Sequence, residues 1–466
     1  MVEKYIEAFN GYVWGAPLMV LLVGVGLFLT FRLLFVQFRG FAHGIKVLRG
    51  NYDDERDPGE ITHFQALSTA LSATIGTGNI VGVAAAILTG GPGAVFWMWI
   101  TALVGMATKF TSCSLAVHFR RIDKNGEAHG GPMHFIEIGM GPKFKWLAVL
   151  FAFFAIMASF GSGNMFQINN VVVSLNELIR GSSEPSFLFN VIVGVVIAIV
   201  VGFVIIGGVK SIGSVASKIV PFMCTFYVIG GVFILTINYS AVPSGFYTIF
   251  YYAFHAPESI AGGILGSVIR SGVARGLFSN EAGLGSAAIA HGAARTKEPI
   301  REGLVAMLGP FIDTICICSM TALVIIVTGA HEVCDVKGEL TGKAFSIGIG
   351  SNIGAKFVAA SIIFFAFSTL ISWSYYGDRA ADYLFGKKAV HPYRIIYLGF
   401  IILGATMKIG PIINFCDSMN GLMAAPNLIA LAVLSPVVAS LTKDYFRRMK
   451  ILKEKPLELG VDIRAN

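Results

Sequence analysis

The sequence predicts an all-α membrane protein with many spans, built from two five-span halves of opposite orientation behind one extra N-terminal span. Of its 466 residues, 55% are apolar and only 13% are charged, whereas a soluble domain carries about 25% charged residues. Eleven apolar stretches are long enough to cross a bilayer. Two of these stretches are interrupted by glycine-rich polar turns about two hundred residues apart.

The first apolar stretch, from Pro17 to Phe35, is too long for the apolar part of a signal peptide, and we expect it to remain as a span. We expect an N-terminal span with its first loop (1–63), a first five-helix repeat (64–237), an external connector (238–259), a second five-helix repeat (260–441) and a tail (442–466). The expected spans are 17–36, 64–90, 92–118, 146–178, 187–207, 217–237, 260–291, 303–329, 356–384, 394–410 and 414–441.

The distribution of basic residues predicts the orientation in the membrane. The net charge is +8, but the Lys and Arg residues gather in alternate loops and in the tail 442–466, while 238–259 has none. Basic loops face the cytoplasm, so we expect the N-terminus outside and the C-terminus in the cytoplasm of a multi-pass plasma-membrane protein. This alternation argues for the lipid bilayer and against nucleic acid as the partner of the positive charge.

A glycine-rich polar turn, Gly76–Asn79, interrupts the second span. Lipid cannot hydrogen-bond an opened backbone, so protein, water or a ligand must satisfy the freed groups. The half-helix after the turn presents free N–H groups that suit a carboxylate, and the carbonyls of Ala73 and Gly76 before it suit a small hard cation. Helix packing by the glycines is the alternative, but packing does not require the polar Thr77 and Asn79.

A second turn, Gly276–Asn280, is predicted to break the seventh span in the same way. Ser279 and Asn280 would orient the ammonium or carboxylate group of a ligand, and Phe278 would form one wall of the pocket. Paired breaks at corresponding places in two halves of a chain are typical of the binding site of a secondary transporter.

Several charged residues fall within the predicted spans. Glu281 is expected to face the protein interior, because a charge exposed to lipid is costly, and to pair with Arg275 or Arg270. Either a structural ion pair or a role in gating would account for it. Lys109 is expected near a span end, where its long side chain reaches the interface. Asp313 is a candidate proton carrier, although no sequence motif identifies it as one.

The fourth span carries Asn164, Gln167 and Asn170 at a spacing of three residues, which places them on one helix face. Buried amides need partners. A substrate amino group is one candidate partner, and hydrogen bonds between helices are the alternative. Gln167, next to Phe166 near the middle of the helix, is the preferred ligand.

The ninth span contains Ser368, Thr369, Ser372 and Trp373. Hydroxyl and carbonyl oxygens suit Na⁺, although Ser and Thr also bond the carbonyl four residues earlier in a helix. Other functions lack their motifs: the chain has no HExxH zinc motif, no GxSxG nucleophile motif and no P-loop. We therefore expect neither an enzyme nor an ATP-driven pump, and neither a transition metal nor an organic cofactor. No ring of charges indicates a channel.

The segment GGPGAVFWMWITALVG at 90–105, together with the two turns, resembles the sodium:alanine symporter family, which transports alanine or glycine with a cation, and the resemblance covers nearly the whole chain. It implies a 5+5 inverted-repeat fold of the leucine-transporter type and Na⁺-coupled import of alanine or glycine by alternating access, with protons used by some members. It places the substrate between the two breaks and an ion beside the first. The predicted substrate-binding residues are Thr77, Gly78, Asn79, Phe166, Gln167, Gly276, Phe278, Ser279 and Trp373, and the predicted sodium-binding residues are Ala73, Gly76, Ser368, Thr369 and Ser372.

Overall fold

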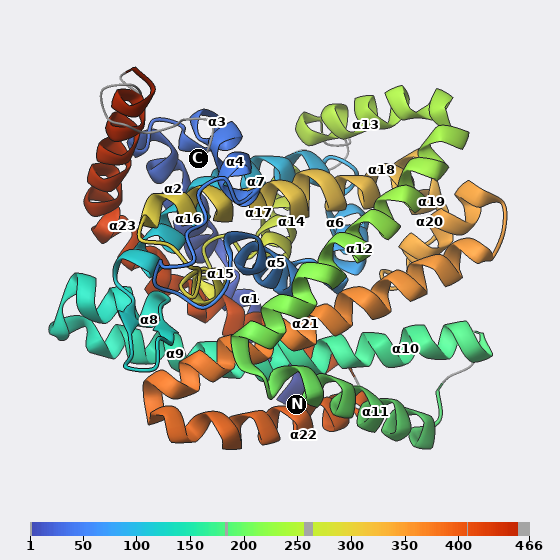
Figure 1. Cartoon of the computed structure of the whole chain (residues 1–466). Coiled ribbons are helices and arrows are strands. Elements are labelled where there is room, and N and C mark those ends of the chain that lie inside the picture. The colour runs from blue at the N-terminus through green and yellow to red at the C-terminus, as the bar shows by residue number, and fades with distance from the viewer. Residues whose placement is uncertain (1, 182–184, 256–263, 408, 455–466) are drawn as a thin grey trace.

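The computed structural model describes residues 2–181, 185–255, 264–407 and 409–454, which are almost entirely helical (Figure 1). The chain begins with α1 (Val2–Val13), α2 (Ala16–Arg32), α3 (Val36–Arg39) and α4 (Phe41–Leu48). It continues with α5 (His63–Thr74), η1 (Thr77–Asn79), α6 (Val81–Gly90), α7 (Ala94–His118), β1 (Arg121–Ile122), β2 (Ala128–His129), α8 (Pro132–Phe135), η2 (Ile136–Met140), η3 (Pro142–Phe144), α9 (Lys145–Phe160), η4 (Gly161–Met165), α10 (Phe166–Arg180), α11 (Phe187–Ile205) and α12 (Gly208–Ile237).

The second half of the chain packs against the first. Helix α14 lies along α7, α10 lies along α21, and α11 (green) lies beside α22 (orange) in Figure 1. The elements of this half are η5 (Tyr239–Ala241), α13 (Val242–Phe254), α14 (Ile264–Asn280), α15 (Ser286–His291), α16 (Pro299–Ala306), α17 (Leu308–Pro310), η7 (Phe311–Cys318), α18 (Ser319–Val327), α19 (Ala330–Val333), α20 (Leu340–Ile349), α21 (Ile353–Phe385), η8 (Lys387–Ala389), α22 (Val390–Thr406) and α23 (Ile409–Glu454).

The described residues contain nine helices that are long and apolar enough to cross a membrane, and a tenth candidate is the pair of helical segments His63–Thr74 and Thr77–Gly90, which is bent by 62°. The chain is therefore a polytopic helical membrane protein. The predicted span 260–291 corresponds to α14 and α15, but its first residues lie outside the described part of the chain. The count of eleven spans and the division into repeats stay predictions.

The first predicted break is confirmed, because α5 ends at Thr74 and α6 begins at Val81. The second lies one turn later than predicted: α14 runs through Asn280, and the chain unwinds over residues 281–285. Glu281, Gly283 and Gly285 adopt φ values of 53°, 99° and 89°, which a right-handed helix cannot contain.

Gly276, which was expected to belong to the second break, instead allows α14 to approach α7. A Cβ atom on this glycine would lie 2.3 Å from Thr101 Oγ1. The packing role of a small residue therefore accounts for this glycine better than an opened backbone does.

The loops at one end of the helix bundle are joined by Arg120. Its guanidinium donates hydrogen bonds to the carbonyl oxygens of Gly292, Ala294 and Thr296 after α15 and of Pro58 before α5. The β1–β2 hairpin follows directly, so we call this the hairpin end of the molecule. Arg120 therefore joins the chain just before α5, in the first broken helix, to the chain just after α15, in the second.

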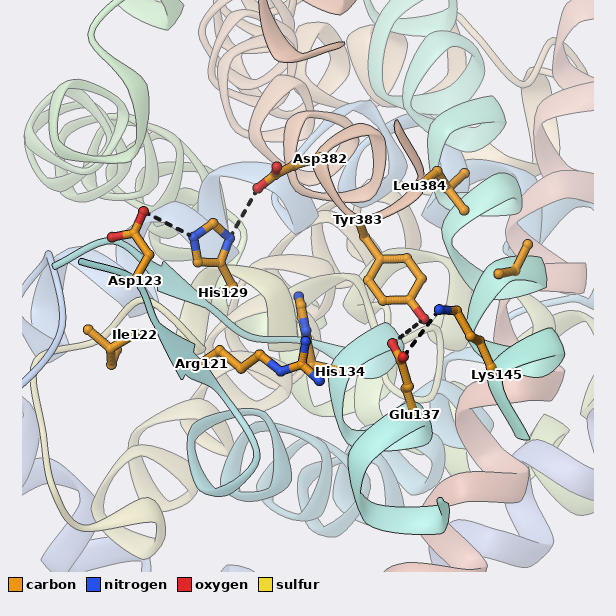
Figure 2. A pocket seen from close by; sticks show the side chains of 11 residues that line it. Arg121, Ile122, Asp123, His129, His134, Glu137, Lys145, Asp382, Tyr383 and Leu384 are labelled. Atoms are coloured by element: carbon orange, nitrogen blue, oxygen red, sulfur yellow. Dashed lines mark hydrogen bonds and ion pairs between the residues drawn. The ribbon is translucent and has the colours of Figure 1, made fainter. Parts of the chain in front are cut away.

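A cavity of about 550 Å³ opens at the hairpin end between the hairpin, α9 and the end of α21. Figure 2 shows His129 between two carboxylates, with Asp382 Oδ2 at 3.0 Å and Asp123 Oδ2 at 3.8 Å. Glu137 accepts a hydrogen bond from Tyr383 on the opposite wall, at 2.7 Å. These contacts attach the hairpin region to α21, far along the chain.

The hydrogen bond that His129 donates to Asp382 raises the pKa of His129 above its usual value. A raised pKa in the folded state means that the stabilisation is fully present below the unfolded-state pKa of about 6.5 and is lost as the pH rises through the folded-state pKa.

We expect His129→Gln to lower the melting temperature more at pH 5.5 than at pH 9, measured by thermal unfolding of the purified protein. The exposed His391 at the same end provides the control, because His391→Gln should leave both melting temperatures unchanged. An equal loss at both pH values would show that the charge of His129 contributes nothing.

Candidate functional site

A second, much smaller cavity of about 20 Å³ lies between the two breaks, away from the large cavity of Figure 2. Its walls come from the first break, η4 and α10, the end of α14, α21 and α23, so it is assembled from segments of both halves of the chain. The described residues that line it are Ala73, Thr74, Gly76, Gly78, Ser162, Gln167, Phe278, Glu281, Trp373 and Asn420.

Six predicted site residues lie in this lining: Gly78, Gln167, Phe278 and Trp373 from the substrate set, and Ala73 and Gly76 from the sodium set. The remaining residues of both sets, Thr77, Asn79, Phe166, Gly276, Ser279, Ser368, Thr369 and Ser372, lie outside the lining as the structure describes it.

Asn79 holds the first break together. Its Oδ1 accepts the N–H of Gly76 at 3.0 Å, and its amide nitrogen donates to Asp313 Oδ1 at 2.7 Å. Both ends of the side chain are therefore used within the protein. Asn79 is positioned to shape the turn, whereas the sequence suggested direct contact with a ligand.

Gln167 connects the first break to the fourth predicted span. Its Oε1 accepts the Thr77 hydroxyl at 3.2 Å, and its Nε2 donates to the Ser162 carbonyl, five residues earlier, at 3.0 Å. The second contact arises at the π-helix η4, where the usual helical pattern is widened. By contrast, Asn164 donates to the Tyr397 carbonyl at 2.8 Å, which agrees with the alternative of a hydrogen bond between helices.

Oxygen atoms of α5 and α21 converge beside the cavity. The hydroxyls of Ser368 and Thr369 lie 3.2 and 3.1 Å from the Ser72 carbonyl oxygen of α5. They also lie 2.9 and 3.0 Å from the Phe365 carbonyl oxygen of their own helix, so each hydroxyl can donate to either acceptor. Ser372, one turn further along the same face, has a buried Oγ with no hydrogen-bond partner among the described residues. A Cβ on Gly76 would lie 2.8 Å from Thr369 Oγ1, so only glycine lets the first break approach these oxygens so closely.

Glu281 brings a carboxylate to the cavity from the second break. It accepts a hydrogen bond from Ser286 at 2.5 Å, and Trp373 lines the same cavity. Its electrostatic partner is Lys109, so the expected pairing with Arg275 or Arg270 is wrong. The guanidinium of Arg275 instead lies 5.8 Å from the ring centroid of Phe278.

Lys109 was expected near a span end, but its side chain is only 3% exposed and it interacts with the carboxylates of Glu281 and Asp313. Asp313 accepts hydrogen bonds from Asn79, Ser279 and Thr314 at 2.7, 2.9 and 2.8 Å. This carboxylate joins the side chains of the first break to the end of α14.

Sequence reasoning did not identify Asn420 on α23, whose amide donates to Ser162 Oγ at 2.9 Å. An amide in an otherwise apolar predicted span was the available signal. Asp313 is likewise a polar residue in an apolar predicted span, but its contact with Asn79, 234 positions away, cannot be recognised from the sequence.

The fold and the paired breaks correspond to known transporters. Residues 1–458 match the model of the sodium:alanine symporter family. The chain belongs to the sodium:alanine symporter family. It is therefore a membrane transporter, a sodium-coupled amino-acid symporter, and not an enzyme.

Relatives agree with this assignment, and a solved structure shares the fold. The chain is 45% identical to the sodium/alanine symporter AgcS of Methanococcus maripaludis, over 94% of this chain and 96% of the relative. It is 37% identical to the probable sodium/glutamine symporter GlnT of Bacillus subtilis, over 97% and 93%. The crystal structure of MhsT in complex with L-phenylalanine has the same fold, with a TM-score of 0.55 and 12% identity over 83% of this chain and 99% of MhsT.

Gly163 sets the position of the Trp373 wall. A Cβ on this glycine would lie 2.3 Å from the indole ring, so Gly163→Ala must displace Trp373 or the π-helix. We expect a loss of stability of about 1–3 kcal/mol from overpacking and at least a tenfold loss of amino-acid affinity, measured by thermal unfolding and by binding titration. Gly399→Ala on α22, where a Cβ meets nothing within 4 Å, is the control and should retain both properties. Unchanged affinity in Gly163→Ala would separate Trp373 from substrate binding.

Proposed function

We propose that the protein imports alanine or glycine together with Na⁺ by alternating access. The observation that carries the proposal is the small cavity between two unwound segments, with the hydroxyl group of Thr369 close to its Gly76 wall. Openings in two membrane helices at one point provide the backbone groups that recognise a zwitterion and a cation.

The first break provides the anion-binding part of the proposed site. The N–H groups around Gly78 lie at the N-terminal, positive end of α6, which favours a carboxylate. Thr77 and Asn79 then act by holding this turn to Gln167 and Asp313. Among the predicted residues outside the lining, Phe166, Gly276 and Ser279 support the walls rather than contact the substrate.

The size of the cavity favours a small substrate. A volume of about 20 Å³ accommodates the centre of about one water molecule, and the rings of Phe278 and Trp373 close two sides. Alanine requires the walls to separate, so its binding is linked to movement of the two halves. Glutamine, the substrate in the name of one relative, requires a larger separation.

The coupling ion is proposed to bind among the oxygens of Ala73, Gly76, Ser368, Thr369 and Ser372. The hydroxyls of Ser368 and Thr369 lie close to the Ser72 carbonyl, and this proximity of α5 and α21 oxygens supports the proposed ion site. Na⁺ and substrate then favour the same arrangement, and such coupling is reciprocal and typically worth about 1–3 kcal/mol.

The proposed movement separates segments of the two repeats, 64–237 and 260–441, that face each other across the cavity. The hairpin end faces the cytoplasm in this proposal, with the N-terminus outside the plasma membrane. The basic loops and tail of the sequence support this orientation.

Uptake into proteoliposomes tests the proposal. We expect accumulation of radiolabelled alanine or glycine only under an inward Na⁺ gradient, and competition by a panel of amino acids should fall steeply with side-chain size. Equal uptake with K⁺ on both sides would contradict coupling to Na⁺. Stronger competition by glutamine than by alanine would contradict the proposed substrate class.

The ion site is tested at Thr369. Thr369→Val keeps the shape of the side chain but removes its hydroxyl, so the Na⁺ concentration for half-maximal alanine uptake should rise at least threefold. Thr369→Ser retains the hydroxyl and should stay within twofold of the unmodified protein. The same Na⁺ dependence in all three proteins would remove Thr369 from the ion site.

A further inference from the structure

We propose that Glu281 binds the ammonium group of the substrate and thereby selects amino acids over hydroxy acids of the same shape. This inference rests on the proposed function, because it assigns a role within the same cavity. Among the described residues that line the cavity, Glu281 is the only one with an ionisable side chain. A zwitterion with its carboxylate at the first break requires negative charge near its other end.

The backbone places Glu281 opposite the first break. It is the first residue after α14 and adopts a left-handed conformation, with φ of 53°, which is uncommon for a residue with a side chain. Gly78 of the first break faces the last turns of α14, since a Cβ on Gly78 would lie 3.6 Å from the Phe278 ring. Gly78 and Glu281 line the same small cavity, so one ligand held there meets both the first break and the carboxylate.

Contacts with Ser286 and Lys109 only partly offset the cost of burying the Glu281 carboxylate. The carboxylate accepts a hydrogen bond from Ser286 and interacts with the positive charge of Lys109, and an ammonium group in the cavity would add the charge partner that burial calls for. Its side chain is only 6% exposed, and a buried carboxylate remains charged only when such partners are present. The same contacts fix the orientation of the carboxylate, so that a ligand does not have to order it.

The balance of buried charge leaves room for one more cation. Lys109 interacts with two carboxylates, those of Glu281 and Asp313. Three neutral side chains, Asn79, Ser279 and Thr314, already donate to Asp313. Because Asp313 does not line the cavity and Glu281 does, an incoming ammonium group meets Glu281.

A structural ion pair between Glu281 and Lys109 is the competing hypothesis. It predicts that loss of Glu281 leaves Lys109 unpaired, with a general loss of stability that affects all ligands alike. Recognition of the ammonium group predicts a selective loss instead. L-Lactate separates the two hypotheses, because it has the shape of alanine but carries a hydroxyl in place of the ammonium group.

The test compares the affinities of L-alanine and L-lactate in the presence of Na⁺, by calorimetric titration or by competition with labelled alanine. Glu281→Gln should weaken alanine binding at least tenfold and leave lactate binding within twofold, so that the preference for alanine falls at least tenfold. Glu281→Asp, which retains the charge, should keep most of the preference.

A double variant provides the decisive control. Lys109→Gln combined with Glu281→Gln removes both members of the pair, so a purely structural role predicts recovery of stability and of alanine affinity. Recognition of the ammonium group predicts recovery of stability at most, with the preference for alanine still lost. This variant also gives the answer if Glu281→Gln alone fails to fold.

The outcomes separate the inference from the function on which it rests. If the unmodified protein binds no small amino acid with Na⁺, the proposed function fails. If it binds alanine and Glu281→Gln keeps the same preference over lactate, or the double variant restores that preference, the role assigned to Glu281 is overturned.

Discussion

The opened backbone of two membrane helices must find its hydrogen bonds within the protein, because lipid offers none, and much of the surrounding structure follows from this requirement. At the first break, Thr321 donates to the Asn79 carbonyl at 2.8 Å and Thr341 donates to the Ile80 carbonyl at 3.1 Å. At the second, Asn427 donates to the Gly283 carbonyl at 2.8 Å. Helices α18, α20 and α23 are thus each tied to a break by one of their polar side chains.

The two breaks are also tied to each other through Asp313. Asn79 reaches this carboxylate from the first break, and Ser279 reaches it from the last turn of α14. A change in the conformation of one break therefore alters a hydrogen bond that supports the other. This arrangement gives a physical route by which an ion bound at one break influences a substrate held between both.

The sequence predicted the membrane class, most helices and the first break. The first break could be predicted because helix packing alone does not require the polar Thr77 and Asn79 beside glycines in an apolar span. It misplaced the second break by one turn, since Gly276 and Ser279 resemble a break but pack within α14, whereas the left-handed Glu281 marks the actual opening. Partners separated by hundreds of residues cannot be predicted from local patterns. For that reason the sequence missed both the interaction of Glu281 with Lys109 and the hydrogen bond from Asn79 to Asp313.

The geometry explains why a cation and an amino acid would act together. Ser368 and Thr369 hold the Ser72 carbonyl of α5 to α21, while Thr77 in the first break is held to Gln167 of α10. Helices α10 and α21 pack along each other, so both contacts join the first broken helix to the same support. In the proposed function, a cation among the α5 and α21 oxygens and a zwitterion beside Gln167 would strengthen parallel connections, and whichever bound first would order part of the site that the other requires.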